Sequence, residues 1–136
     1  MWRARLACAR RAMRRTRTQP AAWSRPDPER PLSPKGHRQA GRVARWLTAI
    51  GHRPDVILSS PKVRAAETAA AVADAFEMRV TDEPRLAEAL GIRLLEEILH
   101  DAGDPARPML VGHDPDFSEL ATLLSGAMSL EMRKGA

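Results

Sequence analysis

Between Ser33 and Gly126, four stretches of the chain carry apolar residues at every third or fourth position. This spacing is typical of helices that bury one face and expose the other. Gly51 and Gly126 are placed to end the first and the last of these helices, and the third is expected over about 91–102. The four predicted apolar faces are Ala40, Val43, Ala44 and Leu47; Ala69, Val72, Ala73 and Phe76; Leu94, Leu95 and Ile98; and Phe117, Leu120, Ala121 and Leu124.

Three short runs between these helices are candidates for strands. Residues 56–58 and 109–112 are continuous apolar runs of the kind found in buried strands, and residues 79–81 are a further candidate. Short apolar strands that alternate with helices predict a parallel sheet with helices on both faces. The predicted fold class is therefore α/β, and the sequence contains no internal repeat.

Polar residues follow two of the predicted strands at the points where those strands end. Ser59 and Ser60 follow the first strand, and His113 follows the last. Ser60 is suited to cap the next helix, with Pro61 at its first position and Arg64 in its first turn. Because open α/β sheets bind ligands at the carboxyl ends of their strands, we expect Ser60, Arg64 and His113 on one rim.

Arg64 and His113 have side chains that suit the binding of an oxyanion. The guanidinium of Arg64 can hold two oxygens at once, beside the free N–H groups at the start of its helix. The imidazole of His113 can donate to a phosphoryl oxygen, and its charge is adjustable near neutral pH. Each residue alone also has an ordinary explanation, since Arg64 could be a surface arginine and His113 could cap a turn.

Length and composition indicate one domain without a membrane span. A chain of 136 residues is large enough for one hydrophobic core and too small for two. It contains no run of the eighteen or so apolar residues that crossing a bilayer requires. The single cysteine, Cys8, excludes an internal disulfide and fits a reducing compartment. We therefore expect a cytoplasmic protein with no membrane partner.

The net charge of +5 belongs to the N-terminal end of the chain. Residues 1–30 contain nine arginines against Asp27 and Glu29, whereas residues 31–136 contain 13 Lys and Arg against 15 Asp and Glu. Recognition of nucleic acid by a domain needs positive charge on a folded face. This distribution therefore does not favour nucleic acid as a partner of the predicted domain.

Three ordered motifs give the sequence a resemblance to a known family. They are Arg30-Pro31-Leu32-Ser33-Pro34-Lys35-Gly36, then Ser59-Ser60-Pro61 with Arg64-Ala65 and Glu67-Thr68, and then Val111-Gly112-His113. From about Ala22 to Ala136, the chain resembles the histidine phosphatase superfamily, which has the phosphoglycerate mutase-like fold. Within that superfamily it looks most like the small SixA-type phosphohistidine phosphatases.

The resemblance implies hydrolysis of phosphohistidine on a protein, through a covalent phosphohistidine on the enzyme. Arg64 matches the family's second arginine and His113 its second histidine, so both are expected to bind phosphoryl oxygens and to act in catalysis, beside Ser60. No metal or cofactor is implied, because arginine and histidine side chains supply the positive charge. Glu88 lies where many members keep a general acid, although the favoured interpretation of this residue is a solvated glutamate at the flank of a helix. The expected partner is a phosphorylated protein or a small phosphorylated substrate.

The chain departs from the family pattern at its N-terminal end. Family members begin with an apolar strand that ends in Arg-His, and this histidine is the nucleophile. No histidine precedes His37 here, and His37, His52 and His100 are interpreted as surface or structural residues. We therefore expect the phosphatase activity of the chain as written to be impaired. The alternative function is a non-catalytic phosphate-binding or interaction module of the same fold.

Residues 1–20 are interpreted as a basic arm and residues 21–136 as a histidine phosphatase-like domain that is incomplete at both ends. The arm is interpreted as disordered or as mis-translated from another reading frame. A transit peptide and a genuine tail for anionic partners, nucleic acid included, stay open as alternatives. No first strand is recognisable in this region, so the predicted sheet lacks it.

Overall fold

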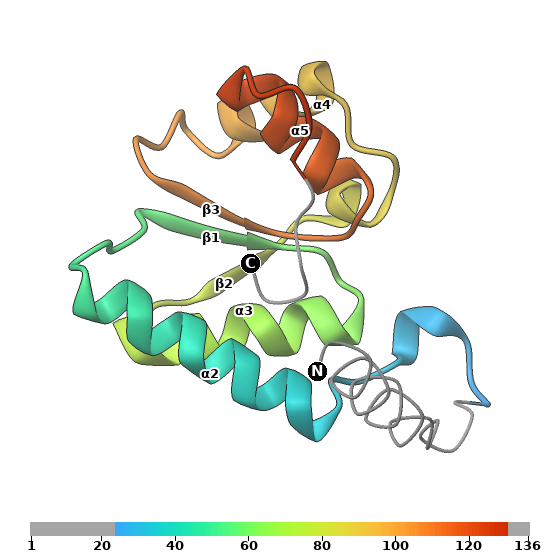
Figure 1. The fold of residues 1–136 in the computed structure, drawn as a ribbon, viewed down its shortest axis with the longest axis vertical. Coiled ribbons are helices and arrows are strands. Elements are labelled where there is room, and N and C mark those ends of the chain that lie inside the picture. The colour runs from blue at the N-terminus through green and yellow to red at the C-terminus, as the bar shows by residue number, and fades with distance from the viewer. Residues whose placement is uncertain (1–23, 131–136) are drawn as a thin grey trace, which may run out of the picture.

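The computed structural model describes residues 24–130, and a three-stranded parallel sheet forms their centre. The strands are β1 (Val56–Ser59), β2 (Val80–Asp82) and β3 (Pro108–Val111), in the order β2-β1-β3. In the register of the sheet, Ile57 of β1 lies opposite Val80 on one side and Met109 on the other. Because all three strands run in the same direction, their carboxyl ends lie at one edge of the sheet (Figure 1).

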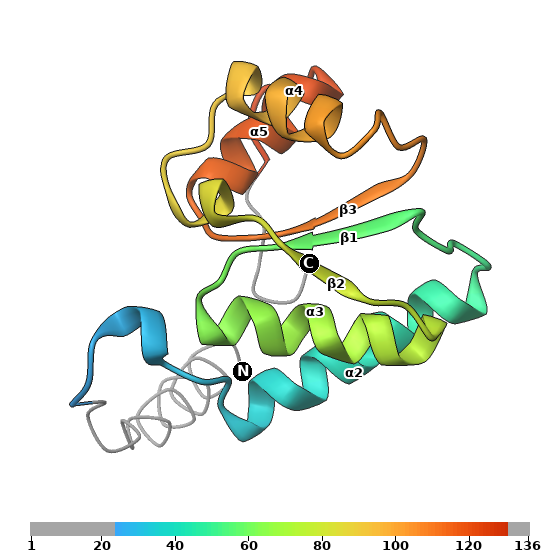
Figure 2. The ribbon, with the colours of Figure 1, turned by 180° about the vertical axis from the view of Figure 1, so that it is seen from behind.

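Helices cover both faces of the sheet, as the sequence predicted. The helices α2 and α3 lie against one face, and α4 and α5 lie against the other (Figures 1 and 2). The helical elements are η1 (Asp27–Glu29), α2 (Pro34–Ala49), α3 (Val63–Phe76), η2 (Pro84–Ala87), α4 (Ile92–Asp101) and α5 (Asp116–Ser125). The α/β class with a parallel sheet between two helical layers is therefore confirmed.

Alanine and β-branched side chains, together with Phe76, fill the layer between the sheet and the helices α2 and α3. The predicted face of α3 is confirmed, since all four of its residues are buried, while α2 buries Ala40 and Ala44. The small alanine side chains let the two helices pack closely on Ile57 of the central strand. The buried cluster consists of Ala44, Ile57, Ala69, Val72, Ala73 and Phe76.

Leucine and isoleucine side chains fill the opposite layer, beneath α4 and α5. Leu95 and Ile98 of α4 are buried as predicted, and so is Leu120 of α5. The prediction for Leu124 is wrong, because this residue is 66% exposed. The spacing of apolar residues along a helix determines which side of the helix is apolar. How many of those residues are buried depends on the elements that pack against the helix. The buried cluster consists of Leu58, Leu86, Leu90, Leu95, Ile98 and Leu120.

The helix ends agree with the turn residues in the sequence. The side chain of Ser33 accepts a hydrogen bond from the Gly36 N–H at the start of α2. Gly126 follows α5 with φ of +68°, a left-handed conformation that glycine adopts without strain. In the described part of the chain, no helix is both long and apolar enough to cross a membrane. The predicted arm, residues 1–20, lies outside the described residues.

Candidate functional site

Ser60 stands at the carboxyl edge of β1 and links the two adjacent strands. Its backbone N–H donates to the Val111 carbonyl at the end of β3, at 2.9 Å. The fully buried Ser60 hydroxyl is hydrogen-bonded to Nε2 of His113 at 2.8 Å and accepts from the Lys62 N–H at 3.3 Å. These contacts place the ends of β1 and β3 side by side, as the topology predicted.

The predicted role of Ser60 as the cap of α3 is wrong. The helix begins at Val63, and Lys62 occupies the cap position without a side-chain hydrogen bond. Ser60 and Pro61 belong to a short turn between β1 and α3. The two extra residues in this turn leave the Ser60 hydroxyl free of a capping role, and it bonds to His113 instead.

His113 follows β3 after one glycine and is half-buried. A Cβ atom at Gly112 would collide with the ring of Phe117, so the absence of a side chain there lets α5 pack closely under the histidine. Burial lowers the pKa of His113 below its usual value, and the nearby charges of Lys62 and Arg64 lower it further. Both effects favour the neutral form of the imidazole.

Arg64 lies in the first turn of α3, where the sequence placed it, and its side chain is 31% exposed. Its Nη1 donates to the Asp27 carboxylate oxygen Oδ2 at 3.0 Å and to the Asp27 carbonyl at 3.1 Å. The hydrogen bond from Arg64 holds the pKa of Asp27 below its usual value, so the carboxylate is ionised. Arg64 is therefore already bound to one anionic group, the Asp27 carboxylate.

Three charged residues near this site were not singled out by the sequence: Asp27, Lys62 and Asp116. Lys62 and Arg64 lower the pKa of His113, and Asp27 and Asp116 oppose them, so all four charges lie within electrostatic range of the imidazole. Asp116 also accepts a hydrogen bond from the Leu90 N–H at 2.9 Å. Lys62 lies within the same sequence motif as Arg64, and this position was the one feature of the sequence that could have pointed to it. Nothing local in the sequence connects Asp27 with a site 37 residues away.

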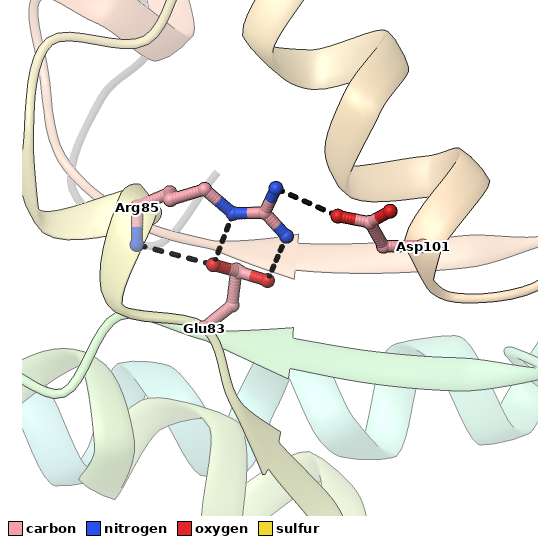
Figure 3. Close-up of polar contacts among 3 residues, drawn as sticks. All are labelled: Glu83, Arg85 and Asp101. Carbon is pink, nitrogen blue, oxygen red and sulfur yellow. Dashed lines mark hydrogen bonds and ion pairs between the residues drawn. The ribbon is translucent and has the colours of Figure 1, made fainter.

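A different glutamate from the one expected forms contacts at this edge of the sheet. Glu88, the candidate general acid, is exposed and follows η2. Glu83 directly follows β2, and its N–H donates to the Ser59 carbonyl at 2.8 Å. Its carboxylate accepts from Nε and Nη2 of Arg85, both at 2.8 Å, and Nη1 of Arg85 reaches Asp101 (Figure 3). These hydrogen bonds hold the pKa of Glu83 below its usual value, so it is an ionised structural anchor for the η2 loop.

The remaining histidines are surface residues. His37, His52 and His100 are all exposed. His37 lies 3.8 Å from Glu67, and His100 lies 3.3 Å from Asp104. Among residues 24–130, no three His, Cys, Asp or Glu side chains are grouped closely enough to hold a metal ion.

The chemistry of these side chains suits a tetrahedral oxyanion at the edge of the sheet. The Lys62 ammonium, just before α3, and the Arg64 guanidinium, in its first turn, lie within electrostatic range of the His113 imidazole, which follows β3. Positive groups in this arrangement stabilise the spread negative charge of a phosphoryl group. The fold and the site together define an α/β domain with a candidate oxyanion site at the carboxyl ends of its strands.

The chain belongs to the histidine phosphatase superfamily (branch 1), whose sequence profile matches residues 13–100. The match begins earlier than the resemblance that starts near Ala22. It includes Ser60, Arg64 and Glu88 and ends before His113. The motif comparison and the profile therefore agree on the family.

Several curated proteins are similar in sequence. The chain is 34% identical over 99 residues to an uncharacterized protein of Mycobacterium tuberculosis, covering 73% of this chain and 61% of that one. It is 32% identical over 112 residues to an uncharacterized chloroplastic protein of Arabidopsis thaliana, covering 74% and 51%. A protein of Picosynechococcus is 32% identical over 105 residues, covering 73% and 62%. The chain thus spans between about half and three fifths of the length of these relatives.

The fold is shared with solved structures of SixA proteins. A SixA of Agrobacterium tumefaciens, which bears the name of a phosphohistidine phosphatase, has a TM-score of 0.67 and 28% identity over 76% of this chain and 68% of that one. A protein histidine phosphatase SixA in complex with tungstate has a TM-score of 0.66 and 24% identity over 75% and 68%. A SixA from Nakamurella has a TM-score of 0.58 and 29% identity over 79% and 64%. The chain therefore has the phosphoglycerate mutase-like fold of SixA.

Proposed function

We propose that this chain binds phosphoryl groups at the carboxyl edges of β1 and β3, and that it is by descent a phosphohistidine phosphatase. Its substrate would be phosphohistidine on a protein, and turnover would be impaired in the sequence as it stands. The observation that carries the proposal is the hydrogen bond between His113 and Ser60, within electrostatic range of Arg64 and Lys62.

Each of the binding residues has a role that follows from its chemistry. Arg64 would hold two phosphoryl oxygens through its planar guanidinium. His113 would donate from Nε2 to a third oxygen once the phosphoryl group replaces Ser60 as the partner of that nitrogen. Both act directly on the phosphoryl group, so we propose Arg64 and His113 as catalytic residues. Ser60 is the third residue of the phosphate-binding group.

Glu88 remains our candidate for the general acid. It lies exposed on the segment that follows η2, where a protein substrate could reach it. The carboxylate of Glu83 is engaged by Arg85 on both oxygens and is a poor proton donor. A phosphoramidate leaving group is readily protonated, so loss of the Glu88 carboxylate should matter less than loss of Arg64.

Impaired turnover follows from the missing nucleophile. A covalent route needs an imidazole in line with phosphorus, in addition to the one that binds an oxygen. No histidine precedes His37 in the sequence, and His37 is exposed on α2. The same observation favours the second candidate function, a non-catalytic module that binds phosphorylated proteins without hydrolysing them.

The substrate class and the location are parts of the same proposal. The Agrobacterium protein of the same fold bears the name of a phosphohistidine phosphatase, which supports a phosphorylated protein as the substrate. The site lies at an open edge of the sheet, formed by exposed and half-exposed residues such as Arg64 and Asp27, where a protein could reach it. A single cysteine is compatible with the proposed cytoplasmic location.

Calorimetric titration with tungstate, an analogue of phosphate, tests the binding site. We expect the full chain to bind tungstate, and we expect Arg64→Ala and His113→Ala each to weaken binding about tenfold or more. Arg93→Ala, which removes an exposed arginine on the far helix α4, is the matched control and should bind normally. Equal binding by all four proteins, or none by the full chain, would contradict the proposal.

Turnover separates the two candidate functions. The full chain is incubated with a phosphohistidine peptide and with an aryl phosphate, and released phosphate is measured. Tungstate binding with little or no release of phosphate fits both an impaired phosphatase and a binding module. To separate these two, a family-like segment that ends in Arg-His replaces the present N-terminal sequence. Restored release of phosphate by that variant would identify an impaired phosphatase. Release at ordinary enzyme rates by the unmodified chain would show that the expectation of impairment is wrong.

A further inference from the structure

The helix α2 carries four cations and no carboxylate on its solvent side. Its 16 residues include no Asp or Glu. All four cations are exposed, and none of them forms an ion pair within residues 24–130. We call this group the basic stripe; it consists of Lys35, Arg38, Arg42 and Arg45.

The basic stripe occupies one face of the helix. Successive residues turn by about 100° around a helix axis, so positions 35, 38, 42 and 45 fall on one side. The buried residues Ala40 and Ala44 fall on the opposite side, against α3 and β1. Trp46, which is 61% exposed, lies beside the stripe on the same face. The stripe is therefore continuous and faces away from the core, on the outer helix of the layer (Figure 1).

The stripe contrasts with the charge of the rest of the domain. Apart from these four residues, residues 31–136 contain nine Lys and Arg against fifteen Asp and Glu. Solubility does not require four cations that lack ion pairs within residues 24–130 on one helix of an otherwise acidic domain, since alternating charges serve that purpose with less self-repulsion. This asymmetry instead favours electrostatic docking of a negatively charged partner.

The stripe begins at the same end of the domain as the candidate site. The backbone N–H of Leu32, just before α2, donates to the Glu67 carboxylate on α3 at 2.6 Å. Glu67 lies one helical turn from Arg64, so the first turn of α2 is tied to the turn that carries the phosphate-binding arginine. A partner that places a phosphoryl group at Arg64 can extend along α2, which is about 24 Å long.

We propose that the basic stripe docks an acidic surface of the phosphorylated protein substrate, an inference that rests on the proposed function. Exposed arginines at a rim accelerate association and select partners of opposite charge. Trp46 offers an amphipathic anchor of the kind enriched at protein interfaces. A bilayer is the weaker candidate, because the apolar face of α2 is buried in the core and, of the large apolar residues, only Trp46 and Ile50 stay exposed there, too few to embed a helix face in lipid.

Fluorescence anisotropy with two labelled peptides tests the docking surface. Both peptides have about 20 residues, long enough to reach along α2 from the site, and both carry a non-hydrolysable phosphonate analogue of phosphohistidine. One peptide has Asp and Glu on the flank, and the other has Asn and Gln at the same positions. We expect the full chain to bind the acidic peptide about tenfold more tightly at low salt, and this preference to shrink at higher salt.

Two double variants that change the net charge by the same amount distinguish an effect of the basic stripe from an effect of the overall charge of the protein. Arg38→Glu/Arg42→Glu should abolish the preference for the acidic peptide while leaving the affinity for the neutral peptide unchanged. Arg79→Glu/Arg93→Glu reverses two exposed arginines outside α2 and should retain the preference. Circular dichroism of each variant confirms that the fold is retained.

Four results would overturn the proposal, each for a different reason. The wild type could show no preference between the peptides, or both double variants could lose it equally. Tighter stripe-dependent binding to duplex DNA or to phosphatidylserine vesicles than to the acidic peptide would assign the stripe to another class of partner. Stripe-dependent self-association in sedimentation would assign it to a second copy. Failure of Arg64→Ala to weaken the neutral peptide would instead contradict the proposed function, irrespective of the stripe.

Discussion

Asp27 and Arg64 are joined by two hydrogen bonds from a single guanidinium nitrogen, which lies 3.0 Å from the Asp27 carboxylate and 3.1 Å from its carbonyl. The carboxylate thereby sits beside the group that we assign to phosphoryl binding. An oxyanion that binds Arg64 must share the guanidinium with Asp27 or displace it, and in either case it meets a like charge.

Asp27→Asn is therefore expected to strengthen the binding of tungstate. The amide retains the size of the side chain and removes the competing negative charge, so we expect the dissociation constant to fall by about two- to fivefold, as is typical of an exposed ion pair. Glu29→Gln removes the same charge from η1 and is the matched control, with no change expected. Unchanged or weaker binding by Asp27→Asn would show that Asp27 helps to position Arg64 instead of competing for it.

The burial of His113 predicts a pH dependence of stability. The pKa of this imidazole is lowered from an ordinary value of 6.5, so the unfolded chain takes up a proton at this residue more readily than the folded protein. The free energy of unfolding should consequently decrease as the pH falls from 6.5 through the lowered pKa, and should be insensitive to this group above that window. Urea denaturation at about pH 7.5 and about pH 5.5 measures the difference.

His113→Gln should flatten this dependence, because glutamine does not titrate. His52→Gln, at an exposed histidine, controls for the loss of an imidazole. If the free energy of unfolding of His113→Gln and of the unmodified chain falls equally between the two pH values, the pKa of His113 is not lowered by folding and the prediction is wrong.

The ion pair between Glu83 and Arg85 is expected to stabilise the folded protein at neutral pH. Glu83→Gln breaks the two-point contact with Arg85 and should lower the free energy of unfolding by about 1 kcal/mol. Since Arg85 lowers the pKa of Glu83, this contribution should persist above the ordinary value of 4.5 and disappear as the pH falls through the lowered pKa. Asp101→Asn, at a more exposed carboxylate with one contact, should cost less. An equal effect of both substitutions would contradict this ranking.

Two glycine substitutions are expected to act in opposite directions. Gly112→Ala forces a methyl group into the Phe117 ring beneath His113, and overpacking of this kind costs about 1–3 kcal/mol. Gly41→Ala lies inside α2, meets only the Arg45 side chain at 3.5 Å, and should stabilise the helix by about 0.5–1 kcal/mol. Thermal unfolding of both variants provides the comparison. A neutral Gly112→Ala variant would show that Phe117 can move away at little cost.

Local patterns in the sequence were enough to predict the helices, the strands and the family. The alternation of helices with short apolar runs predicted the parallel sheet, and the ordered motifs around Arg64 and before His113 predicted the superfamily. These features are readable because helix periodicity and turn chemistry act over a few residues. The topology rule for parallel sheets then brought Ser60 and His113 to one edge.

The contacts around the site were decided only by the tertiary structure. Asp27 reaches Arg64 across 37 residues, and Asp116 reaches the Leu90 N–H across 26. The hydroxyl of Ser60 bonds to His113, 53 residues away, and does not cap α3. A sequence pattern cannot rank such partners, because a short polar side chain fits several of them equally well.

The sequence by itself determined which side of each helix is apolar and which residue types stand at the strand ends, because both follow from local geometry. Only the tertiary structure decided how far burial extends, leaving Leu124 exposed, and which carboxylate occupies the guanidinium of Arg64. Both outcomes depend on distances between elements that are remote in sequence, and those distances are set by the packing of the whole domain.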